Sequence, residues 1–363
     1  MKKKWAPIAA GVSLLVMLLI CVFSIAESKR ETSSEVTRSM EINHKKLEIT
    51  AYVERSRMTR SELSDCVDGA FSLCQEYSKK YFDEEDPTSE LGRITDQQQK
   101  GVGGLYELSP VPLLLVRSGL ALTDFSDGAY DMTAGALYRL LTDADEEPSE
   151  EEIARALKTC GVEGVTIEEN GVRLQSGVLL DLSTLIDSFM CRTLEEYFVL
   201  CGVSDVYVRY GDVVLIMGGQ LISKGILFWG RIETQPFEIV LPDAYPNLKE
   251  DKPEVLDGYY AWAARPEAAK ANADYVDEVP FISTVNGRPY DHDTGSVAVV
   301  LENGPRAWYA HAIAHMLLSV GKDNAMKLLQ SNILETTFGL KIRYVRFEST
   351  SGETTVYESL EEN

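Results

Sequence analysis

A long apolar run near the N-terminus constrains the topology of the whole chain. Residues 5–26 contain only two polar side chains, both serines, and lysines at positions 2–4 precede them. About 20 apolar residues are enough to cross a bilayer as a helix. Because lysines stay on the cytoplasmic side, the remainder of the chain is expected outside the cytoplasmic membrane.

Residues 1–26 have three interpretations. The first is an uncleaved anchor in the cell membrane. The second is a cleaved signal segment, because Ser24-Ile25-Ala26 has small residues at its first and third positions. The third is lipidation at Cys21, although Ile20 stands where a lipoprotein signal has a small residue. All three predict a body that works outside the cytoplasmic membrane.

The chain is strongly acidic, with a formal net charge of −22 at pH 7 over 363 residues. A nucleic-acid-binding surface needs a basic footprint, so nucleic acid is excluded as a partner. The same charge argues against docking on anionic lipid, and it favours a body that self-repulsion keeps dispersed.

The cysteines do not predict a disulfide framework or a zinc site. Of the six, Cys21 lies in the apolar run, which leaves an odd number in the body, and no CxxC spacing occurs. Cys66 and Cys74 fall two turns apart on one face of a predicted helix, too distant to pair. The favoured interpretation is that the cysteines of the body are buried small hydrophobic residues.

Composition and periodicity divide the chain into four segments. These are a membrane anchor or signal segment (1–26), a polar tether (27–40), one large mixed domain (41–347) and an acidic, disordered tail (348–363). Helical periodicity is expected over 61–81, 110–125, 135–141, 193–201, 308–321 and 323–329. Strands are expected over 47–53, 165–168, 172–174, 178–181, 206–210, 213–217, 296–301 and 340–347. Strands and helices interleave without regular βαβ alternation, which predicts an α+β fold.

Three local signals refine this outline. Ser149 and Glu152 form a capping box at the start of a further helix. Gly211-Asp212 joins two strands as a hairpin-type turn. Residues 242–278 show weak periodicity and several prolines, and we expect a long irregular insertion there.

The connection over residues 126–133 is the first candidate site. It places the turn dipeptide Asp127-Gly128, the aromatic Tyr130 and the carboxylate of Asp131 within eight residues. Loops that carry such groups are often sites. Considered alone, the stretch is better explained as a plain loop between two helices, with Asp127 as a cap.

Several segments, taken in order, resemble the ApbE family, the FAD:protein FMN transferases. Residues 88–94 resemble the family's S-E-[IL]-S-R-L-N segment, and residues 126–137 (SDGAYDMTAGAL) resemble TDGAFDPTVGPL. The further matching segments are 180–182 (D-L-G-G-I-A-K-G), 210–212 with Gly218 (the glycine hairpin), 229–232 (W-x-V-G-I), 287–299 (T-G-Y-P…S-V-T-V) and 310–321 (A-D-A-L-A-T-A-L-F-V-L-G). The resemblance rests on their order and spacing.

The resemblance implies a single α+β domain of ApbE type and an enzyme outside the cytoplasm. Such an enzyme takes FAD as its substrate, moves FMN onto a threonine of an acceptor protein of the cell envelope, and releases AMP. This phosphoryl transfer depends on positioning and on a metal ion, magnesium in the family. By resemblance, Ala129, Tyr130 and Asp131 bind the flavin nucleotide. Asp181 matches the aspartate that opens the metal-proximal segment.

Four departures from the family pattern affect the phosphate and metal side. Asp187-Ser188 replaces K-G, so an anion stands where the family has a lysine. Residues 280–284 replace H-I-I-D-P and lack both its histidine and its aspartate. Thr95 replaces the asparagine after S-R-L. The fourth departure is at the magnesium ligands.

His311 and His315 replace the aspartate and threonine that hold magnesium in the family. Imidazole is a poor ligand for magnesium. Two histidines four residues apart on a helix share a face, as zinc ligands do. One interpretation is therefore a transition-metal site at His311 and His315 with Asp181 or Asp187 as third ligand. The other is that these histidines bind no metal.

Two functions follow from this pattern. The first is a working or altered FMN transferase. The second is a catalytically inactive homologue that binds flavin or a partner protein. The replacements at Asp187, Ser283, His311 and His315 weigh against magnesium-dependent transfer.

Overall fold

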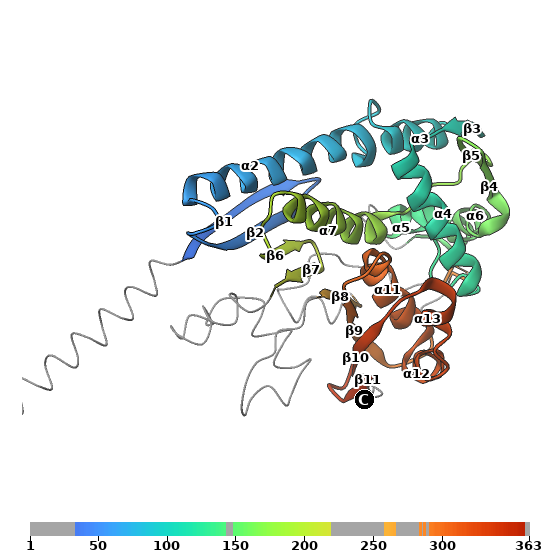
Figure 1. The fold of residues 1–363 in the computed structure, drawn as a ribbon. Helices are drawn as coiled ribbons and strands as arrows, with labels where there is room; N and C mark the ends of the chain where they lie inside the picture. The colour runs from blue at the N-terminus through green and yellow to red at the C-terminus, as the bar shows by residue number, and fades with distance from the viewer. Residues whose placement is uncertain are drawn as a thin grey trace, which may run out of the picture.

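The structure is a computed structural model that describes residues 33–142, 148–218, 258–265, 283–284, 286–287 and 290–359 (Figure 1). The predicted membrane anchor over 1–26 lies outside these ranges. Among the helices that are described, none is long and apolar enough to cross a membrane. The described residues form one mixed α+β fold, as the sequence predicts.

A large antiparallel sheet forms the centre of the fold. Its strand order is β1-β2-β6-β7-β8-β9-β10-β11, and each neighbouring pair is antiparallel. The strands are β1 (Ser33–Ile42), β2 (Lys45–Glu54), β6 (Asp205–Tyr210), β7 (Val213–Met217), β8 (Gly258–Ala264), β9 (Thr294–Glu302), β10 (Ile342–Ser349) and β11 (Thr354–Glu358). The pairing of β2 with β6 brings distant parts of the chain together, with Leu47 opposite Tyr210.

Three helices cover one face of this sheet (Figure 1). They are α2 (Arg60–Tyr77), α7 (Ser183–Leu200) and α11 (Ala310–Val320). α2 contacts β1 and β2, α7 contacts β6 and β7, and α11 contacts β8 and β9. Alternate strand residues face this helical layer because successive side chains of a strand point to opposite faces. In β6, for example, Val206 and Val208 join the main core, while Tyr207 joins a smaller cluster on the other face.

The chain between α2 and α7 builds the second part of the fold, which lies at the end of the molecule away from the start of β1 (Figure 1). It contains a π-helical turn (Ser78–Phe82), α3 (Glu90–Gln99), α4 (Pro110–Phe125), α5 (Gly135–Thr142), α6 (Glu150–Leu157) and a 3-10 turn (Val162–Gly164). A small antiparallel sheet, in the order β3-β5-β4, is made of β3 (Gly104–Glu107), β4 (Val165–Glu168) and β5 (Gly171–Leu174). A 3-10 turn (Ala307–Tyr309) precedes α11, and α12 (Lys322–Gln330) and α13 (Ile333–Phe338) follow it.

Several local predictions are confirmed. The helix over 110–125 has the predicted bounds, and the capping box of Ser149 and Glu152 is present at the start of α6. The hairpin through Gly211-Asp212 joins β6 to β7. The helix expected from Ser61 begins slightly earlier, with Thr59 as the N-cap whose side chain accepts from the Glu62 amide.

Two predicted segments at the ends of the domain are wrong in part. The tether over 27–40 overlaps β1, and the tail over 348–363 overlaps β11. Both strands lie at the edges of the sheet, where one side of the strand is unpaired and polar side chains are common. Most described residues of β1 are therefore exposed, and the strand looks like a polar linker in the sequence.

Three predictions inside the domain also differ from the structure. The helix over 193–201 is α7, which begins at Ser183, because Asp187 and Ser188 are buried helix residues rather than part of a polar connection. Residues 178–181 form only a single bridge, between Leu179 and Ala134, instead of a strand. The insertion over 242–278 contains β8, and its remaining residues, apart from Arg265, lie outside the described ranges.

Candidate functional site

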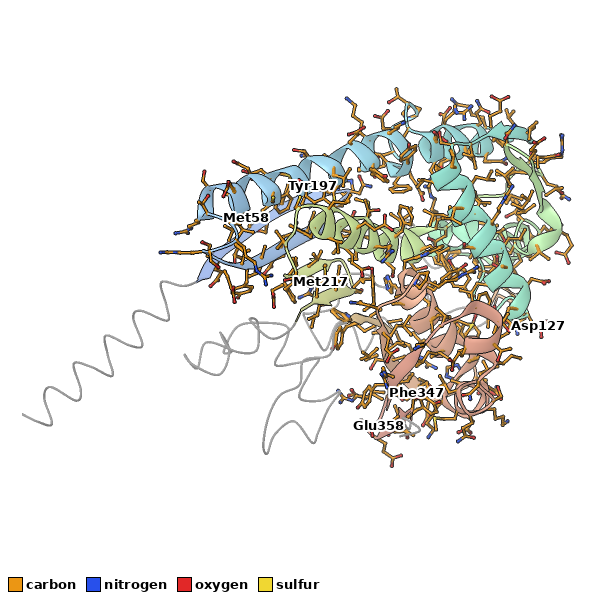
Figure 2. All side chains as sticks on the ribbon, in the orientation of Figure 1. Met58, Asp127, Tyr197, Met217, Phe347 and Glu358 are labelled. Carbon is orange, nitrogen blue, oxygen red and sulfur yellow. The ribbon has the colours of Figure 1, made fainter. Side chains whose placement is uncertain are left out.

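The loop over residues 126–133 is a tightly hydrogen-bonded turn at the end of α4 (Figure 2 labels Asp127). Asp127 and Gly128 both adopt positive φ, at 49° and 78°, which reverses the chain after the helix. The Ser126 hydroxyl oxygen accepts from the Tyr130 amide at 3.0 Å. The amide of Gly128 donates to the Thr123 carbonyl at 3.0 Å. This network holds the predicted flavin-binding residues in one conformation.

Asp131 is buried and shapes the loop from within. Its Oδ1 accepts from the Thr133 amide at 2.8 Å and from the Thr133 hydroxyl at 2.5 Å. The Thr133 hydroxyl oxygen in turn accepts from the Gly161 amide at 2.6 Å. Asp131 therefore fixes the backbone at Thr133, and these contacts are structural.

Asp181 meets this loop at the start of α7. Its amide donates to the Met132 carbonyl at 2.7 Å, and its Oδ1 accepts from the Ser183 amide at 3.1 Å and hydroxyl at 2.7 Å. The hydroxyls of Tyr130 and Thr184 lie 3.3 Å apart. The four predicted cofactor-binding residues, Ala129, Tyr130, Asp131 and Asp181, thus come together at one place.

Glu84 is a carboxylate of the site that the sequence analysis missed. It forms an ion pair with Arg139 of α5 at 3.0 Å, and 29% of its side chain is exposed. Burial of the carboxyl group, followed by the nearby charge of Asp181, raises the pKa of Glu84 to about 7. Lys45 and Arg139 also act on this carboxylate electrostatically and oppose the rise. Glu84 therefore interacts electrostatically with Asp181 and also with Lys45, which belongs to a second cluster.

The second cluster is centred on Asp187 of α7, which is 1% exposed. Lys45 Nζ donates to both of its carboxylate oxygens, at 3.1 and 2.9 Å. His311 Nδ1 lies 3.2 Å from Asp187 Oδ2, although the two are not aligned as a hydrogen bond. The His311 amide donates to the Ser188 hydroxyl at 3.1 Å. Strand β2 and helices α7 and α11 therefore meet at this carboxylate.

Gly211, in the hairpin turn between β6 and β7, closes the cluster. It has φ +57°, and a Cβ at this position would stand 3.1 Å from Asp187 Oδ2. A side chain there would be strained by its backbone conformation and would crowd the carboxylate. The predicted glycine turn is thus a packing requirement of the site.

Lys45 changes the meaning of the Asp187 replacement. The sequence predicts that an anion in place of the family's lysine reverses the local charge. In the structure, the ammonium group of Lys45 lies against that anion, so the pair is neutral. Lys45 gives no signal in the sequence because 142 positions separate it from Asp187.

His311 and His315 share one face of α11, as predicted, with ring centroids 5.4 Å apart and rings nearly perpendicular. Within the described residues, no group of three histidine, cysteine, aspartate or glutamate side chains is arranged to hold a metal ion. Both oxygens of Asp187, the nearest carboxylate, are already bonded to Lys45. Imidazole and a lysine-bound carboxylate do not fit magnesium. The transition-metal interpretation remains a prediction.

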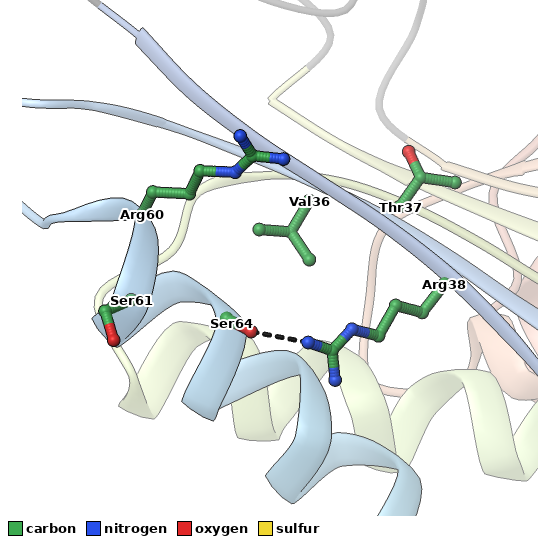
Figure 3. A pocket seen from close by; sticks show the side chains of 6 residues that line it. All are labelled: Val36, Thr37, Arg38, Arg60, Ser61 and Ser64. Atoms are coloured by element: carbon green, nitrogen blue, oxygen red, sulfur yellow. Dashed lines mark hydrogen bonds between the residues drawn. The ribbon is translucent and has the colours of Figure 1, made fainter.

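One surface cavity adjoins these clusters, and another lies away from them. A cavity of about 420 Å³ is lined by Glu84, Thr95, Asp96, Gln99 and Arg139, among others, so the departure at Thr95 adjoins the site. The other, of about 390 Å³, lies between β1 and the start of α2 (Figure 3). There Arg38 donates to the Ser64 hydroxyl at 2.6 Å. That cavity contains none of the predicted site residues.

The described residues define a mixed α+β protein, and comparison with known sequences identifies its family. The sequence model of the ApbE family matches residues 44–243, more than half of the chain. The chain therefore belongs to the ApbE family, as its motifs predict.

Individual relatives agree. The chain is 23% identical over 249 residues to a FAD:protein FMN transferase of Vibrio cholerae serotype O1, covering 65% of this chain and 70% of the relative. The flavin transferase ApbE from Vibrio cholerae has a TM-score of 0.64 at 18% identity, covering 90% of this chain and 97% of that one. The apo flavinyl transferase ApbE of Pseudomonas stutzeri has a TM-score of 0.63 at 13% identity, with coverages of 90% and 96%. The structural likenesses confirm the fold.

We predict that replacing Lys45 destabilises the protein strongly. Lys45→Met leaves the Asp187 carboxylate buried without its cation, which should lower the free energy of unfolding by about 3 kcal/mol. Lys45→Met/Asp187→Leu should recover much of this loss because the unpaired charge is gone. Urea unfolding of both variants provides the measurement.

Lys46→Met is the matched control, because this neighbouring lysine is 64% exposed and pairs at the surface with Glu48. Its effect should stay within about 0.5 kcal/mol. Equal losses for the Lys45 and Lys46 variants would contradict a special role for the buried pair.

Proposed function

We propose that this chain is a FAD:protein FMN transferase that moves FMN from FAD onto a threonine of an acceptor protein. Membership of the ApbE family and the likeness to a curated transferase support the proposal. The observation that carries it in the structure concerns Glu84. This carboxylate interacts electrostatically with Asp181, which contacts the 126–133 loop, and with Lys45 of the Lys45–Asp187 pair. The proposal specifies one property of the acceptor protein, a threonine that receives FMN.

In the proposed reaction, the threonine hydroxyl attacks the phosphorus on the FMN side of the FAD pyrophosphate. The bond from that phosphorus to the AMP oxygen breaks, AMP leaves, and the hydroxyl proton passes to a base. Glu84 is suited to accept it, because a pKa near 7 keeps part of its population ionised at neutral pH. Asp131 and Asp181 position the loop and the start of α7.

Lys45 and Arg139 supply positive charge near the anionic pyrophosphate in this proposal. Each is paired with a carboxylate, Asp187 and Glu84 respectively. Protonation of Glu84 removes one negative charge beside Arg139, which favours an anionic phosphate there. Because the described side chains do not fit magnesium, we assign no step to a metal.

The decisive experiment is a transfer assay. The purified full chain is incubated with FAD and an acceptor protein that a family member flavinylates on threonine, with magnesium, manganese or zinc in separate reactions. We expect AMP release together with acceptor whose mass has increased by FMN. Absence of both products with every metal would reject the transferase. A fluorescence titration with FAD would then decide whether a flavin-binding homologue remains.

The raised pKa of Glu84 predicts pH-dependent FAD binding. As pH rises through about 7, Glu84 gains a negative charge close to the site of the anionic pyrophosphate. We expect the Kd for FAD to rise about threefold to tenfold between pH 6 and 8. Glu84→Gln should remove most of this dependence, and the exposed neighbour Glu85→Gln is the control. Fluorescence titrations at each pH provide the measurement, and identical profiles for both variants would contradict the assignment.

We also propose that the body works outside the cytoplasmic membrane, anchored through residues 1–26. The lysines at 2–4 and the apolar run at 5–26 support this orientation. In intact spheroplasts, an externally added protease should degrade the body, while a cytoplasmic marker survives. Protection of the body until the cells are lysed would reject the orientation.

A further inference from the structure

Helices α2 and α7 lie side by side in a regular antiparallel register. The rings of Tyr77 and Phe189 have centroids 6.5 Å apart. Further along, the Tyr197 hydroxyl lies 2.1 Å from where a Cβ on Gly69 would stand, so glycine allows the two helices to approach closely. Figure 2 labels Tyr197 where the two helices run beside each other. The start of α2 therefore lies beside the end of α7.

One turn beyond the Gly69–Tyr197 contact, the same register places two cysteines opposite each other. Cys66 lies one turn before Gly69 in α2, and Cys201, the C-cap of α7, lies one turn after Tyr197. The two thiols lie close enough to interact electrostatically. Tyr197 also interacts electrostatically with Cys201.

Accessibility distinguishes this pair from the other facing cysteines. Cys66 and Cys201 are both partly exposed, whereas Cys74 and Cys191, deeper in the same interface, are buried. Thiol–disulfide exchange requires that an attacking sulfur reach the oxidant. Of these two pairs, the outer one alone combines proximity with access from solvent.

We propose that Cys66 and Cys201 form a disulfide when the chain meets a disulfide-bearing oxidant, such as a thiol oxidoreductase outside the cytoplasm or oxidised glutathione. One thiolate attacks the oxidant and forms a mixed disulfide, releasing the first reduced thiol. The second cysteine then attacks the protein sulfur of that mixed disulfide, and the second reduced thiol leaves. The two cysteines lose two protons and two electrons, and the oxidant gains them.

The cross-link would act on the candidate site through α7. It fixes the C-terminal end of α7 to α2, while the first turns of α7 carry Thr184, Asp187 and Ser188. It also closes a loop from residue 66 to residue 201, and closing long loops restricts the unfolded chain most. This inference extends beyond flavin transfer and does not depend on it.

The first test identifies the bond directly. The full chain is purified without reductant, incubated with oxidised glutathione, alkylated in denaturant and digested. We expect one cross-linked peptide pair containing Cys66 and Cys201, lighter by two hydrogen atoms than its separate peptides. Cys160→Ser should retain the pair, and Cys66→Ser/Cys201→Ser should lack it. Complete alkylation of Cys66 and Cys201, or a bond between Cys74 and Cys191 in place of theirs, would overturn the proposal.

The second test separates a disulfide from mere packing of the two side chains. Under oxidising conditions, the Tm of the unaltered chain should exceed that of Cys66→Ser/Cys201→Ser by about 5 °C. With reductant present, most of this difference should vanish. A difference that reductant leaves unchanged would reject the cross-link. Because neither readout uses FAD, failure here is distinguishable from failure of the proposed transferase.

Discussion

The arrangement of the site depends on the buried ion pair between Lys45 and Asp187. Removing two charges from water is costly, and only close pairing offsets that cost. The pair therefore fixes the start of β2 against α7, with Gly211 and His311 completing the surroundings of the carboxylate. The neighbouring turns of α7 hold Asp181 and Thr184 against the 126–133 loop. One interaction thus sets the relative positions of the sheet, the central helix and the loop.

Local chemistry made much of the fold predictable. Pro110 begins α4, Ser149 caps α6, and Gly211 turns the β6–β7 hairpin, because each residue satisfies a conformation that few others tolerate. The family motifs also grouped Asp181 with residues 129–131, and these residues lie close together in the structure. The helix start, the cap and the turn depend on short stretches of chain, and the grouping of site residues depends on the order and spacing of motifs. A sequence shows both kinds of signal.

What sequence reasoning missed depends on contacts between distant residues. Glu84 lies in an acidic turn and gains its raised pKa only from its folded surroundings and from Asp181. The first half of α7 has polar residues that look exposed until Lys45 and His311 are placed beside them. The edge strands β1 and β11 carry polar side chains because only part of each faces the core. None of these partners is visible in a local pattern.

The strand order of the large sheet has a consequence for how the molecule is assembled. From β1 to β11, neighbours in the sheet follow the order of the strands in the chain, once the segment between β2 and β6 is set aside. No later strand has to insert between two that have already paired. If the N-terminal strands become available first, each later strand can therefore add to the same edge of the sheet. A strand pair that forms early is also a pair of the final sheet, so it does not have to separate before the next strand adds.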